Sequence, residues 1–348
     1  MELSKKDTKM IQGLSVLAMV CLHLFDRYDY EGLFCPLIFL HGYPLSFYFG
    51  QICDFCVMGF AFCSGYSHMA MIQSMGTKQY YSRSWKRIAV LYCNYWIVLV
   101  LFTILSLVMG QGANIPGSLS KFLGNFFGVT YTYNESWWYL FSYVVLVALS
   151  PILLKQLQKR GSILCLAVSF AIYLIAFYVR YMSGLNGWVA VQFGKIGMTL
   201  FEYILGAVFF AKKFFSKLKQ LHQWIEEKIG STQYYIGWCL VLFAIFLGRT
   251  LVIPNMIVAP FSGLVFIVWF CLKKKPKWIE RIFLFFGTHS TNIWLTHFFF
   301  YAVIFVDLVY IAKYPILIYL FMLIITSCLS VGINKVLVPI RKVILNER

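Results

Sequence analysis

Long apolar segments alternate with short polar segments along the whole chain. A run of about 17–25 apolar residues is long enough to cross a bilayer as an α-helix. Ten such runs can be distinguished, at approximately residues 9–26, 47–72, 88–110, 136–154, 161–180, 195–211, 233–248, 254–272, 282–306 and 314–334. The pattern predicts an all-α integral membrane protein with about ten transmembrane helices.

The composition excludes a soluble protein. Hydrophobic residues make up 61% of the 348 residues and charged residues only 12%, which is too few charges to cover a folded surface in water. No linker or change of composition marks off a soluble part. We therefore expect one transmembrane domain over residues 1–348.

The basic residues indicate the orientation of this domain. The net charge is +17, and Lys and Arg are concentrated in the loops that an inside N-terminus places on the inner face, which predicts an N-in, C-in topology. The basic clusters are short and lie between membrane-length segments, so the lipid bilayer is an expected partner and nucleic acid is not. The basic residues assigned to the outer side are Arg27, Lys121, Arg180, Lys195, Arg249 and Lys313.

The first apolar segment carries a polar stripe. Gln12 and His23 are eleven residues apart, which on a helix is only about 20° from a whole number of turns, and Lys9 lies one turn further on the same face. A titratable group inside a membrane helix is a candidate functional residue. The alternative is that Lys9 extends to the inner interface and His23 hydrogen-bonds a neighbouring helix.

The second segment contains Asp54 and the sequence Ser64-Gly65-Tyr66. Gly65 is expected to permit close helix approach, and the hydroxyl groups of Ser64 and Tyr66 are candidate donors to a reacting oxygen. A lone carboxylate in this position needs a cationic partner or a proton, unless Asp54 reaches the outer interface.

The ninth segment combines several polar residues on one helix. Ser290 and His297 are seven residues apart and share a face, with His297 near the middle of the segment. Asn292 is another candidate donor to the reacting oxygen, although Asn292 and Thr296 can equally hydrogen-bond neighbouring helices.

Aromatic residues stand at the outer end of the fourth segment. Trp137 and Trp138 next to Glu135 are typical of an interfacial aromatic belt. The same residues could form a platform on which a sugar stacks, so both interpretations stay open.

A basic group precedes the third segment on the inner side. Arg83, Lys86 and Arg87 are explained by topology alone, or they could hold the phosphates of a nucleotide-bearing substrate. Phosphate-loop, dinucleotide and zinc-protease motifs are absent from the sequence, and we predict no metal site.

Taken in order, these motifs resemble the acyltransferase-3 family of ten-helix membrane O-acyltransferases, which modify cell-surface polysaccharides and other envelope sugars. The sequence is most similar in character to exopolysaccharide acyltransferases of Gram-positive bacteria. The motifs are Lys9-Met-Ile-Gln12 with His23, Ser64-Gly65-Tyr66, Arg83-Ser-Trp-Lys86-Arg87, Ser136-Trp137-Trp138-Tyr139 with Pro151, and Gly287-Thr-His-Ser290-Thr-Asn292 with His297.

The resemblance implies an acyl-CoA donor, commonly acetyl-CoA, that enters from the cytoplasm, and no permanently bound cofactor. It implies an acceptor hydroxyl on an extracellular or envelope glycan, and a location in the cell membrane. The family usually carries a basic residue at the position of Gln12, and here only Lys9 could supply that charge. A carboxylate that the family often carries eight residues before the proline of the fourth segment, here Pro151, corresponds to Tyr143.

These observations lead to a hypothesis of acyl transfer. His23 acts as general base or acyl carrier, with Ser64, Tyr66 and His297 as further catalytic residues. The donor-binding residues are Lys9, Gln12, Arg83, Lys86 and Arg87, and the acceptor-binding residues are Glu135, Trp137 and Trp138. The alternative is a non-catalytic transporter or ligand sensor, although the internal symmetry typical of many transporters is not detectable.

Overall fold

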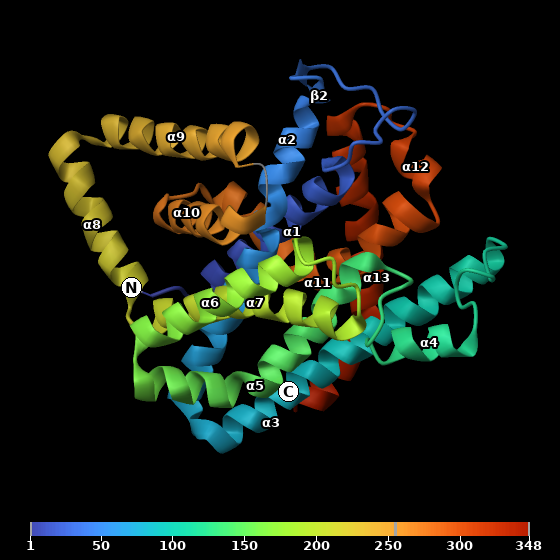
Figure 1. Ribbon diagram of the computed structural model, residues 1–348, viewed down its shortest axis with the longest axis horizontal. Helices are drawn as coiled ribbons and strands as arrows, with labels where there is room; N and C mark the ends of the chain where they lie inside the picture. Colours follow the sequence, from blue (N-terminus) through green and yellow to red (C-terminus); the bar gives the residue numbers. More distant parts are fainter. Residues whose placement is uncertain (1, 254–255, 347–348) are drawn as a thin grey trace. The chain divides into compact units, whose positions relative to one another are not determined.

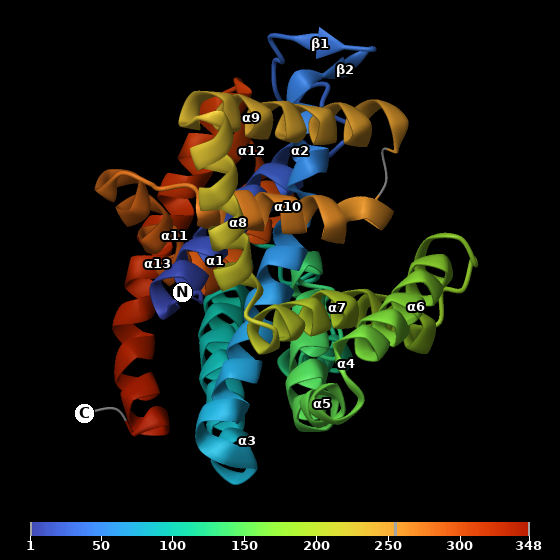
Figure 2. The ribbon, with the colours of Figure 1, turned by 90° about the vertical axis from the view of Figure 1, so that its left-hand side faces the viewer.

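The computed structural model describes residues 2–253 and 256–346, and these are mostly α-helical (Figures 1 and 2). Strands in the described chain are limited to the antiparallel hairpin of β1 (Phe39–Leu40) and β2 (Tyr43–Pro44). The helices are α1 (Lys5–Phe25), α2 (Leu45–Ile52), α3 (Cys56–Val108), α4 (Leu119–Phe126), α5 (Trp138–Arg160), α6 (Ser162–Tyr181), α7 (Trp188–Ala211), α8 (Phe214–Ile229), α9 (Ser231–Leu247), α10 (Ala259–Leu272), α11 (Lys277–Phe298), α12 (Val306–Tyr310) and α13 (Pro315–Leu345).

Seven helical stretches of the described chain are long and apolar enough to cross a membrane. One of them, Leu45–Val108, contains two of the predicted segments. The segments predicted at 254–272 and 282–306 correspond to α10 and α11, except that residues 254 and 255 lie outside the described part. The all-α membrane fold is confirmed, while the number of ten crossings and the N-in, C-in orientation stay predictions.

The long helix α3 is interrupted at Gly76. Its 53 residues would extend for roughly 80 Å as one straight helix, far more than the ~30 Å hydrocarbon core of a bilayer. Gly76 has a φ of 74°, a conformation that glycine adopts without steric cost. The break therefore divides α3 into two membrane-length parts.

The helices group into two compact units, each assembled from separate stretches of chain. The first unit comprises Met1–Asp26, Ser46–Ser74 and Ile152–Thr288. The second unit comprises Arg27–Leu45, Met75–Pro151 and His289–Arg348. Helices α3, α5 and α11 each contribute residues to both units.

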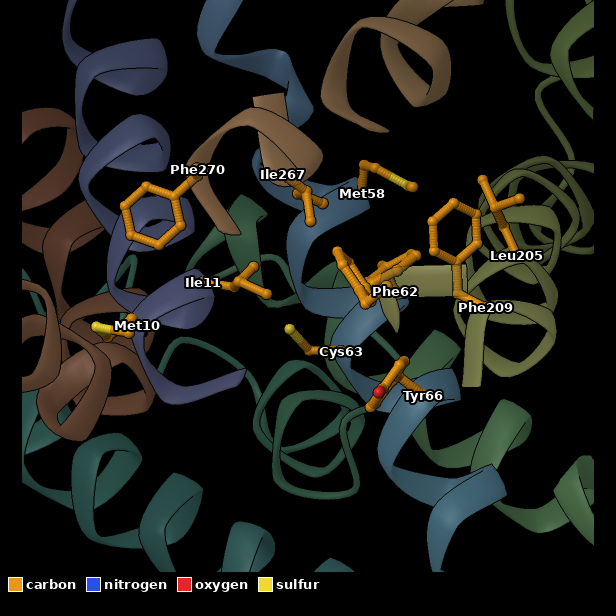
Figure 3. Close-up of a cluster of buried hydrophobic side chains, with 11 residues drawn as sticks. Met10, Ile11, Met58, Phe62, Cys63, Tyr66, Leu205, Phe209, Ile267 and Phe270 are labelled. Atoms are coloured by element: carbon orange, nitrogen blue, oxygen red, sulfur yellow. The ribbon is translucent and has the colours of Figure 1, made fainter. Parts of the chain in front are cut away.

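The first unit has an apolar core formed by α1, α3, α7, α8 and α10. Side chains from these five helices meet in one buried cluster (Figure 3). Its members are Met10, Ile11, Met58, Phe62, Cys63, Tyr66, Leu205, Phe209, Phe215, Ile267 and Phe270. The cluster packs α1, which carries the predicted polar stripe, together with four other helices.

Glycines set the closest helix contacts of this unit. A Cβ atom on Gly13 of α1 would collide with the carbonyl oxygen of Phe283 in α11, and one on Gly287 would collide with that of Lys9. A Cβ on Gly65 of α3 would likewise meet the backbone of α7. The predicted role of Gly65 in close helix approach is thus confirmed.

Candidate active site

His23 lies in the last turn of α1, and its side chain is partly exposed. Helix α1 ends at Asp26. The backbone of α2 lies close to this point, since a Cβ atom added to Gly50 would be only 2.7 Å from the Asp26 nitrogen. His23 therefore lies close to the point where α1 ends beside α2.

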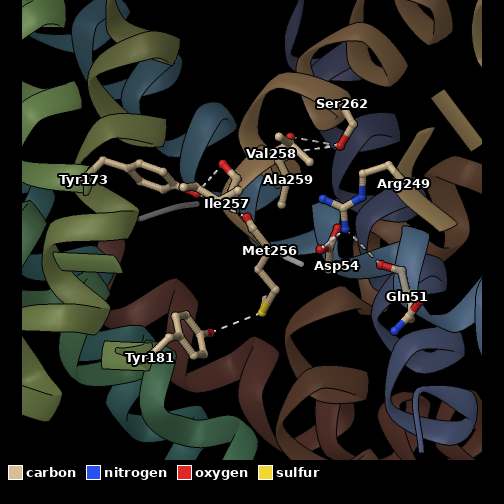
Figure 4. A network of polar contacts seen from close by, with 10 residues as sticks. All are labelled: Gln51, Asp54, Tyr173, Tyr181, Arg249, Met256, Ile257, Val258, Ala259 and Ser262. Carbon is tan, nitrogen blue, oxygen red and sulfur yellow. Dashed lines mark hydrogen bonds and ion pairs between the residues drawn. The ribbon is translucent and has the colours of Figure 1, made fainter. Parts of the chain in front are cut away.

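A buried ion pair joins Asp54 to Arg249 in the same unit (Figure 4). The two side chains are 4% and 7% exposed, and the guanidinium also donates to the carbonyl oxygen of Gln51 at 3.4 Å. Of the alternatives left open for Asp54, the structure shows the cationic partner. Arg249 lies in a buried π-helical turn, Gly248–Val252, and its predicted place on the outer side of the membrane stays a prediction.

This ion pair belongs to the region around the end of α1 that bears His23. Asp26, three residues beyond His23, lies within electrostatic range of Arg249 and of Asp54. The end of α1 and the short helix Cys53–Phe55 also pack against each other. His23, Asp26 and the Asp54–Arg249 pair therefore form one polar region of the first unit.

The predicted stripe on α1 is present. The Lys9 ammonium donates to the Gln12 side-chain oxygen at 3.1 Å, and both residues are partly exposed. The eleven residues from Gln12 to His23 correspond to roughly 16 Å along the helix. Lys9 and Gln12 thus contact each other at some distance from His23.

Ser64 and Tyr66 are not near His23. The Tyr66 hydroxyl donates to the Glu2 carboxylate and accepts from the backbone N–H of Leu3, both at 2.9 Å. These contacts place Tyr66 beside the start of α1, roughly 30 Å along the helix from His23. Ser64 lies in the same turn of α3, so the expectation that these hydroxyls stabilise an oxyanion at His23 is wrong.

In the second unit, both polar atoms of the Asn292 amide are hydrogen-bonded. Its amide nitrogen donates to the Ser330 hydroxyl at 2.9 Å and to the Asn334 oxygen at 3.0 Å, and its oxygen accepts from Asn94 at 2.6 Å. Nδ1 of His289 lies 2.8 Å from the same Ser330 hydroxyl. The network links α3, α11 and α13, which favours the structural interpretation of Asn292.

His297 is enclosed in the core of the second unit. Its side chain is fully buried, and Nδ1 lies 3.1 Å and 2.9 Å from the carbonyl oxygens of Ile293 and Trp294. Nδ1 therefore carries the proton and donates to its own helix. This environment explains His297 as a helix-stabilising residue and gives no support to its predicted catalytic role.

Trp137 is not a sugar platform. Its indole is 2% exposed, donates to the Leu295 carbonyl at 3.0 Å and packs against the rings of Tyr95 and Phe299. Glu135 is exposed and Trp138 is partly buried beside it. The predicted acceptor platform is thus wrong for Trp137, because both ring faces are inside the protein.

The basic group on α3 has an additional member. Arg83 is exposed, and Lys86 and Arg87 are partly exposed. Arg87 lies within electrostatic range of Arg83, of Tyr143 and of Arg341 in α13. The sequence analysis did not include Arg341 in this group, because only the packing of α13 brings it close to Arg87. The available signal was its position among the basic residues predicted on the inner side.

The fold and these polar residues define a multi-pass membrane protein with reactive groups inside and at the ends of its helices. A family model described as an acyltransferase domain matches residues 9–335, nearly the whole chain. The chain therefore belongs to the acyltransferase-3 family, and it is a membrane acyltransferase. No curated protein and no solved structure matches it.

Proposed function

We propose that this acyltransferase moves an acyl group, most simply acetyl, from cytoplasmic acyl-CoA to a hydroxyl of an envelope glycan at the cell membrane. The observation that supports a role for His23 is its place in the polar region at the end of α1, partly exposed in the first unit. A neutral imidazole can accept the proton of a hydroxyl as a general base.

The chemistry balances with His23 as a general base. A ring nitrogen of the neutral imidazole takes the proton of the acceptor hydroxyl while the oxygen attacks the thioester carbon. The carbon–sulfur bond then breaks, and the CoA thiolate receives the proton from the imidazolium. A glycan ester and free CoA are formed, and His23 returns to its neutral state.

The basic group of the second unit is the proposed site for the CoA phosphates. Arg83, Arg87 and Arg341 bring like charges together, and bound phosphates would relieve their mutual repulsion through charge-assisted hydrogen bonds. The planar, forked guanidinium suits phosphate oxygens better than a lysine ammonium does.

Neutralising this group should weaken donor binding selectively. The triple variant Arg83→Gln, Lys86→Gln, Arg87→Gln is expected to raise KM for acetyl-CoA at least about tenfold, because hydrogen bonds to charged groups contribute about 1.5–3 kcal/mol each. KM for the glycan should change far less. Steady-state kinetics in proteoliposomes measure both constants.

The matched control for this experiment is Lys155→Gln with Lys159→Gln, which removes charge at the end of α5 instead. Protease accessibility of the loops verifies that both variants keep the wild-type orientation. An unchanged donor KM in a correctly oriented triple variant would leave the three residues with a topological role only.

Lys9 should supply the charge that the family places at the position of Gln12. Lys9→Ala is expected to impair acyl transfer, and adding Gln12→Arg should restore much of it, because a cation returns to the same face of α1 one turn higher. Coupling between neighbours is typically ~0.5–3 kcal/mol, so the recovery is measurable as non-additive rate changes. A silent Lys9→Ala would show that this charge only sets topology.

The proposed reaction itself is tested with purified protein in proteoliposomes. Release of free CoA from acetyl-CoA is followed with and without envelope polysaccharide, and ester formation on the polysaccharide is measured in parallel. Glycan-dependent CoA release with matching ester formation supports the proposal. Binding of acetyl-CoA without any turnover would contradict it.

A further inference from the structure

Helix α7 carries a stripe of buried polar side chains that the proposed reaction does not yet use. Gln192, Lys195, Thr199 and Glu202 are each between 1% and 7% exposed. Their spacing of three and four residues places them on one face of the helix. Gly206 continues this face and packs on Phe62 of α3, because a Cβ there would collide with the Phe62 carbonyl oxygen. The stripe is therefore directed into the first unit.

Two of these side chains are incompletely hydrogen-bonded. Neither polar atom of the Gln192 amide, nor Oε2 of Glu202, has a hydrogen-bond partner within the described residues. The Thr199 hydroxyl differs, because it donates to the Lys195 carbonyl at 2.8 Å. Buried polar groups are normally satisfied, and ionisable groups inside a membrane segment usually mark a functional site.

The stripe adjoins the Asp54–Arg249 pair. Glu202 interacts electrostatically with Asp54 and with Tyr173 of α6. The Tyr173 hydroxyl in turn donates to the Ile257 carbonyl at 2.9 Å, a contact drawn together with the ion pair in Figure 4. The polar region that contains His23 thus extends through the interior of the first unit to α7.

The charges of this region favour a neutral ligand. Among its buried side chains, Asp54 and Glu202 supply two carboxyl groups, and Arg249 and Lys195 supply two cations, while Asp26 is exposed, so the buried set is close to balanced. The negatively charged CoA phosphates match the excess positive charge around Arg87 better than they match this balanced set. A free amide and a free carboxyl oxygen are instead the groups with which proteins bind hydroxyls, since the amide both donates and accepts.

We infer that Gln192 and Glu202 bind hydroxyl groups of the acyl acceptor, a polyhydroxylated and sugar-like molecule, inside the first unit. This inference rests on the proposed function, since it assigns the acceptor of that reaction. It assigns acceptor binding to residues of α7 in place of the aromatic platform predicted at Trp137. Both residues act on the acceptor only, so donor binding should not depend on them.

The first test is ligand-induced thermal stabilisation, because a ligand that binds only the folded state raises Tm. Cellotriose, maltotriose and tri-N-acetylchitotriose are the acceptor probes, and acetyl-CoA is the donor probe. At least one trisaccharide is expected to stabilise the wild-type protein. Gln192→Leu and Glu202→Leu should lose that shift and keep the shift produced by acetyl-CoA.

The unliganded stability of Gln192→Leu separates a binding role from a structural one. Removing a buried, unbonded amide should leave Tm unchanged or raise it, because no hydrogen bond is broken. A residue that merely supported the fold would lower Tm when replaced. The matched control is Thr199→Val on the same face, whose hydroxyl is satisfied within α7 and which should keep the trisaccharide shift.

In turnover, the two variants should raise KM for the glycan at least about tenfold with little change in KM for acetyl-CoA. Retention of the trisaccharide shift and of the glycan KM in both variants would overturn the inference, as would the absence of a shift from every trisaccharide in wild type. If wild type transfers acetyl groups in these cases, the proposed function survives. If wild type neither binds nor consumes acetyl-CoA, the proposed function itself fails.

Discussion

His23→Ala will reduce acyl transfer by about 10²–10⁴-fold, which is the usual contribution of a general base. The protein should remain folded, because the His23 side chain is partly exposed at the end of α1 and its loss leaves no buried cavity. The rate of ester formation in proteoliposomes and the Tm of the purified variant measure the two effects separately.

A second histidine serves as the control for this change. His222 lies on the polar helix α8, 3.4 Å from the Glu226 carboxylate, and the proposed reaction gives it no role. His222→Ala should therefore keep most of the activity. If His23→Ala retains a tenth or more of the wild-type rate, His23 is a packing residue and the proposed mechanism is wrong.

Breaking the Asp54–Arg249 pair will have the largest effect on stability. Arg249→Met leaves the Asp54 carboxyl buried without its cation, and removal of one partner of a buried pair typically costs about 3–5 kcal/mol. The free energy of unfolding in mixed detergent micelles, or the Tm in the same detergent, is the measurement. Activity should be lost together with stability.

The double variant Asp54→Leu, Arg249→Met should recover most of the lost stability, because apolar replacement of a whole buried pair is often neutral. It would remain inactive if the pair shapes the region around His23. Equal destabilisation of the single and double variants would mean that Arg249 acts through contacts other than Asp54.

The features predicted well from the sequence are those that depend on one segment at a time. Apolar length fixes where membrane helices form, and helical periodicity fixes which residues share a face. The Lys9–Gln12 contact follows from a spacing of three residues within α1, so it could be predicted without knowledge of any neighbouring helix.

The features predicted poorly depend on which helices pack together. Hydropathy is the same for a side chain that faces lipid and for one that faces protein, so the sequence alone did not show that Trp137 is buried or that Arg249 reaches Asp54. The polar residues of α7 were different. The spacing of Gln192 and Glu202 within an apolar helix was visible in the sequence and was overlooked.

The glycine contacts of the first unit have a consequence for engineering and for divergence of the sequence. Substituting alanine for glycine is a common route to stabler helices, but at Gly13, Gly65, Gly206 or Gly287 the added methyl group would push apart two backbones. Lipid-facing positions tolerate exchange among Leu, Ile, Val and Phe. A distant relative with the same helix crossings should therefore be easier to recognise by these four glycines than by its overall identity.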